Sequence, residues 1–200
     1  MFGKATLVMD RGYDDNKMFL KLDALKQDYV IRLKSNRKLF YHNKWVMATE
    51  LRNRRKGKVR MPLYYKGKTH DAYLSHVKVQ ITASKKDVYL VPVYGITEHP
   101  MMLANNKDIK SKEDVIAVAK QYFSRWKIEE YFRCKKQMFQ FENFRVRRHT
   151  AINALNFYIT LCMTFLAHRS MKSETNTLKV SIIQKAVVSN TTYFYCSKNL

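Results

Sequence analysis

The chain has 200 residues, with 38 Lys+Arg against 16 Asp+Glu, a formal net charge of +22, and 46% hydrophobic residues. This apolar content excludes disorder, and the length suits one domain or a large piece of one. Three widely spaced cysteines exclude a disulfide scaffold or CxxC-type zinc site, and five glycines that form no phosphate-binding loop argue against a nucleotide-cofactor enzyme.

The first 33 residues predict a strand, a helix and a second strand. Residues 5–9 (ATLVM) form a short apolar run that predicts a buried strand ending at Asp10. The turn sequence RGYDDN follows, and its acidic side chains are suited to capping a helix over residues 18–25. The run YVIRL at 29–33 predicts the second strand. This order indicates an α/β fold.

Residues 60–104 predict strands without helices. The four expected strands cover 61–65, 73–81, 88–94 and 101–103, with hairpin turns at the KGK and SKK segments between them. We interpret this stretch as part of a β-rich insertion, at about residues 45–104, within the α/β domain.

Helices are predicted for the rest of the chain. A capping box at Ser111 and Asp114 opens a single long helix over about residues 111–138, and further helices follow at 151–169 and 180–188, within about 150–190. The apolar run 154–167 is shorter than a membrane span and contains polar residues, so we expect a buried helix and no membrane partner. No secretory signal is expected at the N-terminus.

The positive charge points to nucleic acid as the partner, because the excess of cations attracts polyanions. The basic residues gather in two short stretches that can each neutralise several phosphates. One stretch comprises Arg52, Arg54, Arg55, Lys56, Lys58 and Arg60, and the other Arg145, Arg147, Arg148 and His149. The alternative is that each stretch is simply a solvated surface.

On the predicted long helix, Tyr122, Arg125, Glu129 and Lys136 fall on one stripe, because offsets of three, four and seven residues keep side chains on the same face. A carboxylate between cations and a phenol suits phosphodiester chemistry with a divalent metal. The alternative is that Glu129 only pairs with Arg125 or Arg133 on the helix surface. Glu130 lies about 100° away and off the stripe. Asp10 has a similar alternative, as a residue that merely forms a turn.

Together, these segments resemble the DDE transposases of bacterial insertion sequences, in particular the insertion-sequence-four group. The matches are VMDRGYDD around Asp10, the segment DYVIRLKSNRK, and YFSRWKIEEYFRCKKQ. The last of these fits the Tyr-Arg-Glu-Lys signature of the group at Tyr122, Arg125, Glu129 and Lys136. The resemblance extends over roughly residues 5–170.

This resemblance implies a ribonuclease-H-like catalytic fold with a β-rich insertion, and metal-dependent cleavage and strand transfer of transposon ends. Asp10 and Glu129 would be catalytic residues and ligands of two Mg²⁺ ions, for which Mn²⁺ can substitute. Tyr122, Arg125 and Lys136 would contact DNA, and the basic stretches nominate Arg52, Arg54, Arg55, Arg147 and Arg148 for the same role. The partners would be transposon ends and target DNA, engaged by a homodimer in the cytoplasm at the nucleoid. No small-molecule substrate is expected.

One departure from the family pattern concerns the first catalytic Asp, which lies on an earlier strand in the family. Residues 1–9 contain no Asp or Glu. The chain is therefore interpreted as an N-terminally truncated catalytic domain over residues 1–200, with weak metal binding and little activity alone. Two alternatives stay open: a catalytically inactive DNA-binding remnant or repressor of an insertion sequence, and a metal-dependent nuclease of the same fold.

Overall fold

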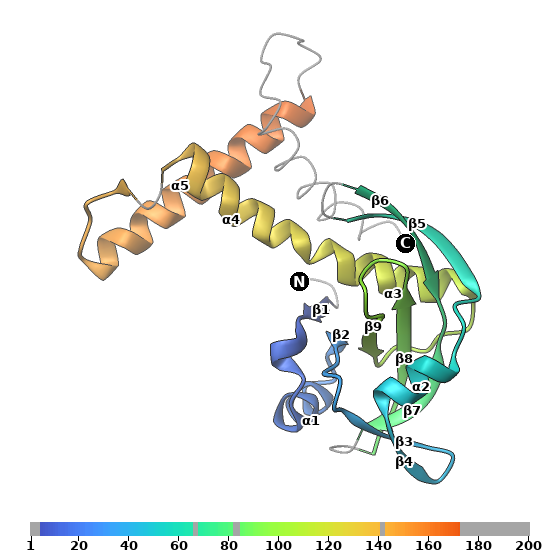
Figure 1. Cartoon of the computed structure of the whole chain (residues 1–200). Coiled ribbons are helices and arrows are strands. Elements are labelled where there is room, and N and C mark those ends of the chain that lie inside the picture. The colour runs from blue at the N-terminus through green and yellow to red at the C-terminus, as the bar shows by residue number, and fades with distance from the viewer. Residues whose placement is uncertain (1–4, 66–67, 82–84, 141–142, 173–200) are drawn as a thin grey trace. The chain divides into compact units, whose positions relative to one another are not determined.

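The computed structural model describes residues 5–65, 68–81, 85–140 and 143–172 (Figure 1). The chain divides into two compact units, Met1–Arg125 and Trp126–Leu200, which are considered separately below. The first unit contains the described strands and three α-helices, and the second contains two α-helices. The expected mixed α/β composition is confirmed. The helix predicted at 180–188 lies outside the described residues.

The N-terminal strand, helix and strand form as predicted. They are β1 (Thr6–Met9), α1 (Asn16–Ala24) and β2 (Asp28–Arg32), and β1 pairs with β2 in parallel. The prediction that the first strand is buried is wrong, because Leu7 is exposed and the rest of β1 is only half-buried. Among the described strands β1 pairs only with β2, so it is an edge of the sheet.

The strand-rich stretch contains one more strand than expected. The elements are β5 (Val59–Tyr65), β6 (Lys68–Leu74), β7 (Val77–Ile81), β8 (Asp87–Tyr94) and β9 (Met101–Asn105). The single strand predicted at 73–81 is two strands, because Ser75 and His76 belong to neither ladder. On one side of this break β7 pairs along the first half of β8, and on the other β6 pairs with the end of β8 and with β5. The antiparallel β5–β6 and β7–β8 pairings confirm both expected hairpins.

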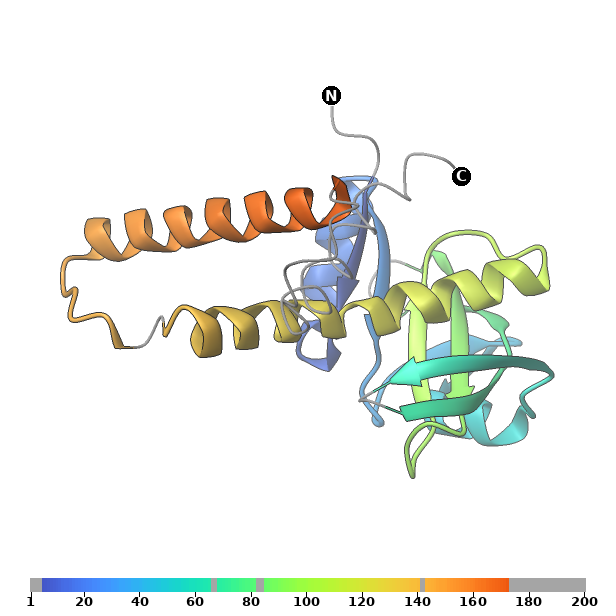
Figure 2. The same cartoon turned by 90° about the horizontal axis from the view of Figure 1, so that it is seen from above.

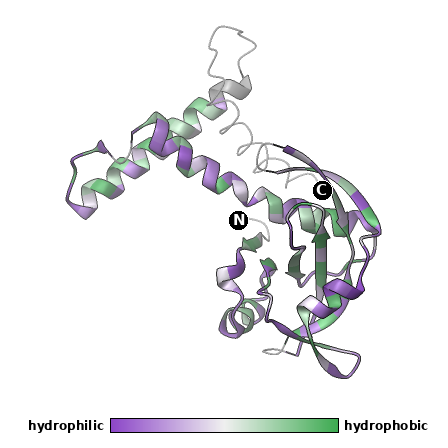
Figure 3. Ribbon diagram, in the orientation of Figure 1, coloured by the Kyte–Doolittle hydropathy of each residue, from purple (hydrophilic) through white to green (hydrophobic). Residues whose placement is uncertain are grey.

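The described strands form one sheet with the order β1-β2-β9-β8-β7-β3-β4, and β5 and β6 continue from β8 (Figure 1). One face packs on α1 and α2 through Phe19, Leu22, Ala48 and Leu51. The other face packs on α3 (Lys112–Ser124), whose apolar side includes Val115. Neighbouring residues of one strand alternate between the two cores, and the central strands are accordingly the most hydrophobic part of the ribbon (Figure 3).

A hairpin and a short helix between residues 38 and 54 were not predicted individually. They are β3 (Lys38–Tyr41), β4 (Lys44–Met47) and α2 (Ala48–Arg54). The turn between the strands consists of His42 and Asn43, both with positive φ, at 47° and 59°. Two consecutive positive φ angles are typical of a type I′ turn, which is usually signalled by Asn-Gly. This hairpin lacks that glycine, so the sequence signal is weak.

The predicted long helix is two helices, α3 and α4 (Trp126–Met138), with Arg125 between them. The backbone N–H of Arg125 donates to the carbonyl of Tyr122 at 3.1 Å, three residues back, so the end of α3 tightens. Arg125 keeps helical angles, φ −55° and ψ −34°. The outer limits of the predicted helix are therefore correct, while the division at Arg125 is a correction.

In the second unit, α4 and α5 (His149–Lys172) run antiparallel (Figure 2). They pack through Cys134 on α4 and through Ile159, Met163 and Ala167 on α5. The expected helix at 151–169 is confirmed, but the prediction that it is buried is wrong. Only 17% of the apolar window within His149–His168 is buried, and Phe165 is 62% exposed. That window is long and apolar enough to cross a membrane, judged by length and composition alone.

Candidate active site and DNA interface

Asp10 stands at the C-terminal end of β1, where the chain turns into the short 3₁₀ helix Arg11–Tyr13. Its Oδ1 atom accepts a hydrogen bond of 2.8 Å from the backbone N–H of Gly12. A Cβ at Gly12 would lie 3.1 Å from that oxygen, so glycine suits this close approach. Asp10 is exposed, and its Oδ2 is the atom that a cation could take. The turn-forming role and the metal role are thus compatible.

Asp14 is occupied by a structural contact and is unsuited to binding metal. Its side chain is fully buried and accepts from the backbone N–H of Lys34 at 2.6 Å. The Arg37 guanidinium donates to Oδ1 through Nε at 2.8 Å, and its Nη2 lies 2.5 Å from the same oxygen. β1 and β2 are parallel, so the segments that follow them leave the sheet at the same end. These contacts join those two segments. The neighbouring Asp15 caps α1 by accepting from the N–H of Lys17.

Glu129 lies in the first turn of α4 and is half-buried. Its neighbour Glu130 is engaged on both oxygens, accepting from the Trp126 indole N–H at 3.1 Å and from Arg133 at 2.6 Å. Arg133, which the sequence offers as a partner for Glu129, pairs with Glu130. The contacts around Glu130 are therefore structural.

The other stripe residues have very different surroundings. Tyr122 is only 5% exposed and belongs to the apolar core beneath α3. Arg125 follows α3 and is half-buried, and Lys136 is exposed near the end of α4. Tyr122 and Arg125 belong to the first unit, and Glu129 and Lys136 to the second. Within α4, the seven-residue spacing keeps Glu129 and Lys136 on one face.

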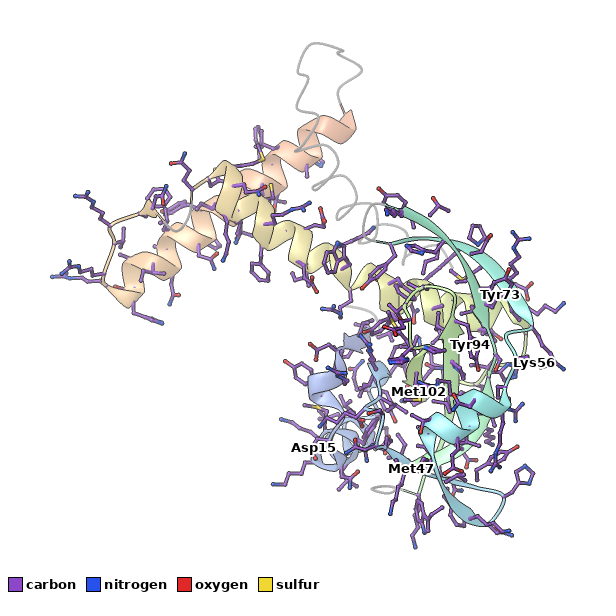
Figure 4. All side chains as sticks on the ribbon, in the orientation of Figure 1. Asp15, Met47, Lys56, Tyr73, Tyr94 and Met102 are labelled. Carbon is purple, nitrogen blue, oxygen red and sulfur yellow. The ribbon has the colours of Figure 1, made fainter. Side chains whose placement is uncertain are left out.

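The first basic stretch is held firmly on the sheet. The Tyr94 hydroxyl donates to the carbonyls of Arg52 and Arg55 at 2.6 and 2.8 Å, and the N–H of Lys58 donates to the Leu74 carbonyl. A Cβ at Gly57 would lie 2.4 Å from the Tyr73 Cβ, so the backbone there needs glycine. Figure 4 shows Lys56 near Tyr73 on the outer side of this region.

Several of the predicted DNA-binding arginines also have protein partners. Arg52 donates to the Pro100 carbonyl at 3.4 Å, Arg54 lies 3.6 Å from Glu50, and Arg55 donates to the Tyr41 hydroxyl at 3.1 Å. The Arg54 pair is exposed and contributes at most about 1 kcal/mol, so this guanidinium can readily exchange its partner for a phosphate.

Arg147 and Arg148 are exposed and precede α5, with the Arg148 carbonyl accepting from the N–H of Ile152 at 3.0 Å. The first turn of α5 contains no acidic residue. Cations at a helix N-terminus oppose the helix dipole, so these arginines do not serve helix stability. An anionic ligand would make their position favourable.

Within residues 5–172, apart from the three internal gaps, no group of three or more His, Cys, Asp or Glu side chains is arranged to hold a metal ion. Asp10 and Glu129 are hard oxygen donors of the kind that Mg²⁺ prefers, so their chemistry fits such an ion. They belong to different units, and their convergence stays a prediction.

Sequence reasoning missed the buried pair of Asp14 and Arg37 and the exposed aromatic hairpin of β3 and β4. An acidic pair, Asp14 and Asp15, in a turn gives no signal of which member is buried. The hairpin carries the alternation of a short strand, but its glycine-free turn conceals it.

The sequence matches the family model of the transposase DDE domain over residues 2–165, which includes Asp10, Tyr122, Arg125, Glu129 and Lys136. Comparison with curated proteins finds no match. The family indicates a transposase that acts on DNA, and DDE transposases generally depend on divalent metal ions. This match covers most of the chain and includes both candidate carboxylates, so the chain belongs to the transposase DDE domain family.

Proposed function

We propose that this chain provides part of the active site for metal-dependent cleavage and strand transfer of transposon ends. The observation that carries the proposal is the family match, which includes both Asp10 and Glu129. This match favours a transposase over a non-catalytic DNA-binding protein.

In this proposal Asp10 and Glu129 hold Mg²⁺, with Mn²⁺ as a substitute. Two such ions, when bound, activate water or a DNA 3′-hydroxyl and stabilise the departing oxygen of the phosphodiester. The Gly12 N–H orients the Asp10 carboxylate through its Oδ1. Arg125 and Lys136 bind the negatively charged strand, and Tyr122 can contribute only through its hydroxyl because its ring lies in the core.

The finer family assignment is also a proposal. The Tyr-Arg-Glu-Lys spacing supports the insertion-sequence-four group and a ribonuclease-H-like fold. The first carboxylate of the triad has no counterpart in residues 1–9, so we propose that a segment outside this sequence supplies it. Two carboxylates alone compensate little of the metal charge, and the chain by itself should bind metal weakly and cleave poorly.

The partners proposed are paired transposon ends and target DNA, held by a homodimer at the nucleoid. The net charge of +22 supports a polyanionic partner. A metal-dependent nuclease of the same fold would use the same carboxylates, but it would cut without joining strands.

A titration with Mn²⁺, followed by electron paramagnetic resonance, tests the two metal ligands. Asp10→Asn and Glu129→Gln should each weaken binding by about 10-fold or more, because each removes a charged oxygen donor. Asp15→Asn and Glu130→Gln are matched controls and should leave the affinity unchanged. An equal loss in Glu130→Gln would show that Glu129 is the wrong ligand.

A cleavage assay tests the proposed inactivity of the chain alone. The chain is incubated with a duplex bearing the ends of its own element, together with Mg²⁺ or Mn²⁺. We expect little or no strand cleavage. Efficient cleavage that Glu129→Gln abolishes would refute the missing-ligand proposal while supporting the enzyme. Cleavage without strand transfer would favour the nuclease.

A further inference from the structure

The β3–β4 hairpin projects from the end of the sheet opposite β1 (Figure 1). Its inner face is anchored, because Leu39 is fully buried, and Tyr41 and Val46 pack on the same core. The Tyr41 hydroxyl also accepts from Arg55 at 3.1 Å. The tight turn at His42 and Asn43 fixes the register of the two strands. The hairpin is therefore a defined structure held at its base, which Met47 marks in Figure 4.

The outer face of the hairpin carries two aromatic rings that the core does not use. Phe40 and Trp45 lie directly opposite each other in the register, with ring centroids 5.0 Å apart and an interplanar angle of 56°. The pair contributes to hairpin stability, but it leaves Trp45 52% exposed. A half-exposed tryptophan held by a neighbouring ring is a stacking surface that is already ordered.

The charge around these rings selects the ligand. Lys38 is exposed and lies on the same face as Phe40, two residues away, whereas Lys44 is opposite Tyr41 and starts from the inner face. The carboxylate in the same cross-strand row, Asp87 opposite Gln80, is paired with Lys78. A protein partner would not favour an exposed lysine beside the two rings, since charged residues are depleted at the core of protein interfaces. A nucleic-acid strand matches the surface on both counts, because its phosphates attract lysine and its bases stack on aromatic rings.

The state of the DNA follows from the same chemistry. In a duplex the faces of the bases are covered by their neighbours, so an aromatic ring reaches them only where bases are unpaired or at an end. We propose that the β3–β4 hairpin binds unpaired DNA, with a base stacked on Trp45 and a flanking phosphate held by Lys38. This inference rests on the proposed function, since it assigns the hairpin a contact with the DNA that the proposed enzyme cleaves.

Fluorescence provides a direct test, because the chain has two tryptophans, Trp45 and Trp126. In a Trp126→Phe background, Trp45 is the only indole. Titration with a thymidine oligonucleotide should quench its emission, and Trp45→Ala should weaken single-strand binding, measured by anisotropy, roughly tenfold, from a stacking contribution of about 1–3 kcal/mol per base. Trp45→Phe should retain part of the affinity. Lys38→Gln should reduce the slope of log K against log salt for single-strand binding by about 0.7, the value for one phosphate of a single strand.

The controls separate this inference from the proposed function. Tyr158→Ala removes an exposed aromatic ring on α5 and should leave single-strand binding unchanged. Duplex binding by Trp45→Ala should stay within about twofold of the parent, well below one tenfold step of 1.4 kcal/mol. Duplex binding without quenching of Trp45 would overturn the hairpin inference alone, whereas failure to bind any DNA would overturn both. A shift in Trp45 emission with protein concentration, in the absence of DNA, would assign the hairpin to self-association and refute the inference.

Discussion

At the scale of single residues, the most consequential contact is the buried pair between Asp14 and Arg37. The Asp14 side chain is fully buried and the Arg37 side chain is 11% exposed. Asp14→Ala should lower the free energy of unfolding by about 3 kcal/mol, because it leaves a largely buried guanidinium without its carboxylate. Urea unfolding, followed by Trp45 fluorescence in a Trp126→Phe background, measures the change.

The matched control for this prediction is Asp15→Ala, which removes the adjacent carboxylate. Asp15 is exposed and caps α1 through the N–H of Lys17, so its loss should cost only about 1 kcal/mol. Similar losses of unfolding free energy in the two variants would show that the Asp14–Arg37 pair is not the contact that joins the segments after β1 and β2.

At the scale of elements, the N-terminus of α3 is held by a capping box that depends on pH. The backbone N–H groups of Lys110 and Ser111 donate to Asp114 and lower the pKa of its carboxyl below the ordinary 3.8. A depressed folded pKa gives stability that is present above the unfolded pKa and is lost as the pH falls through the folded pKa.

We therefore expect Asp114→Asn to lower the melting temperature at neutral pH, and the difference from the parent chain to disappear as the pH falls below 3.8. Glu113→Gln, which removes the preceding charge in the same first turn, should have a smaller effect because Glu113 is not part of the box. Circular dichroism melts at a series of pH values measure both. A difference that is constant with pH would contradict the role of the ionised carboxylate.

The helix pair of the second unit depends on a buried lysine. Lys135 donates to Asn156 Oδ1 at 2.7 Å and to Thr160 Oγ1 at 2.8 Å, and its ammonium lies 4.7 Å from the centre of the Tyr131 ring. Lys135→Ala should destabilise this unit by about 2 kcal/mol, because it removes both bonds and the packing of the aliphatic stem.

Unfolding of the second unit can be followed through Trp126 in a Trp45→Phe background. Lys136→Ala, at the exposed neighbouring position, should change stability by less than about 0.5 kcal/mol. Equal effects of the two substitutions would mean that the contacts from Lys135 to α5 do not stabilise the pair.

The elements that the sequence predicted best are those that form continuous apolar runs or a helical repeat. β2 and β8 are short apolar runs buried on both faces, and the apolar residues of α3 recur at helical spacing, so all three form where they are predicted. The division of residues 73–81 follows from a change of pairing partner, because β6 pairs with β5 and the end of β8 whereas β7 pairs with the first half of β8. The composition of the segment does not reveal where that change occurs. The exposure of α5 was missed because an apolar helix has the same composition whether it is covered or open.

For the candidate site, the family signature indicated the residues, while the structure explains the roles of their neighbours. Asp10, Asp14 and Asp15 are the same residue type within one short segment, yet their roles differ. Asp10 accepts from the Gly12 N–H, Asp14 is buried against Arg37, and Asp15 caps α1. Those differences depend on which side chains the fold brings to each carboxylate, and Arg37 is 23 residues from Asp14. Sequence spacing does not contain that information.

At the scale of the whole molecule, the net charge of +22 raises the question of which cations contact DNA and which only add to the general field. Arg147 and Arg148 are the strongest candidates for direct contact with DNA, because they lie at the N-terminus of α5, where cations are unfavourable without an anion. If both contact phosphates, Arg147→Gln with Arg148→Gln should reduce the slope of log K against log salt for duplex DNA by about 1.8, from about 0.9 for each phosphate.

A matched variant removes the same charge elsewhere. Lys17→Gln with Lys21→Gln takes two exposed lysines from α1 and should reduce the slope much less, since these lysines act only through a field that salt screens within about 8–10 Å. Anisotropy titrations of both variants at several salt concentrations make the comparison. Equal reductions would show that binding follows total charge, in which case the arginines before α5 are not contact residues and the DNA interface must lie elsewhere on the chain.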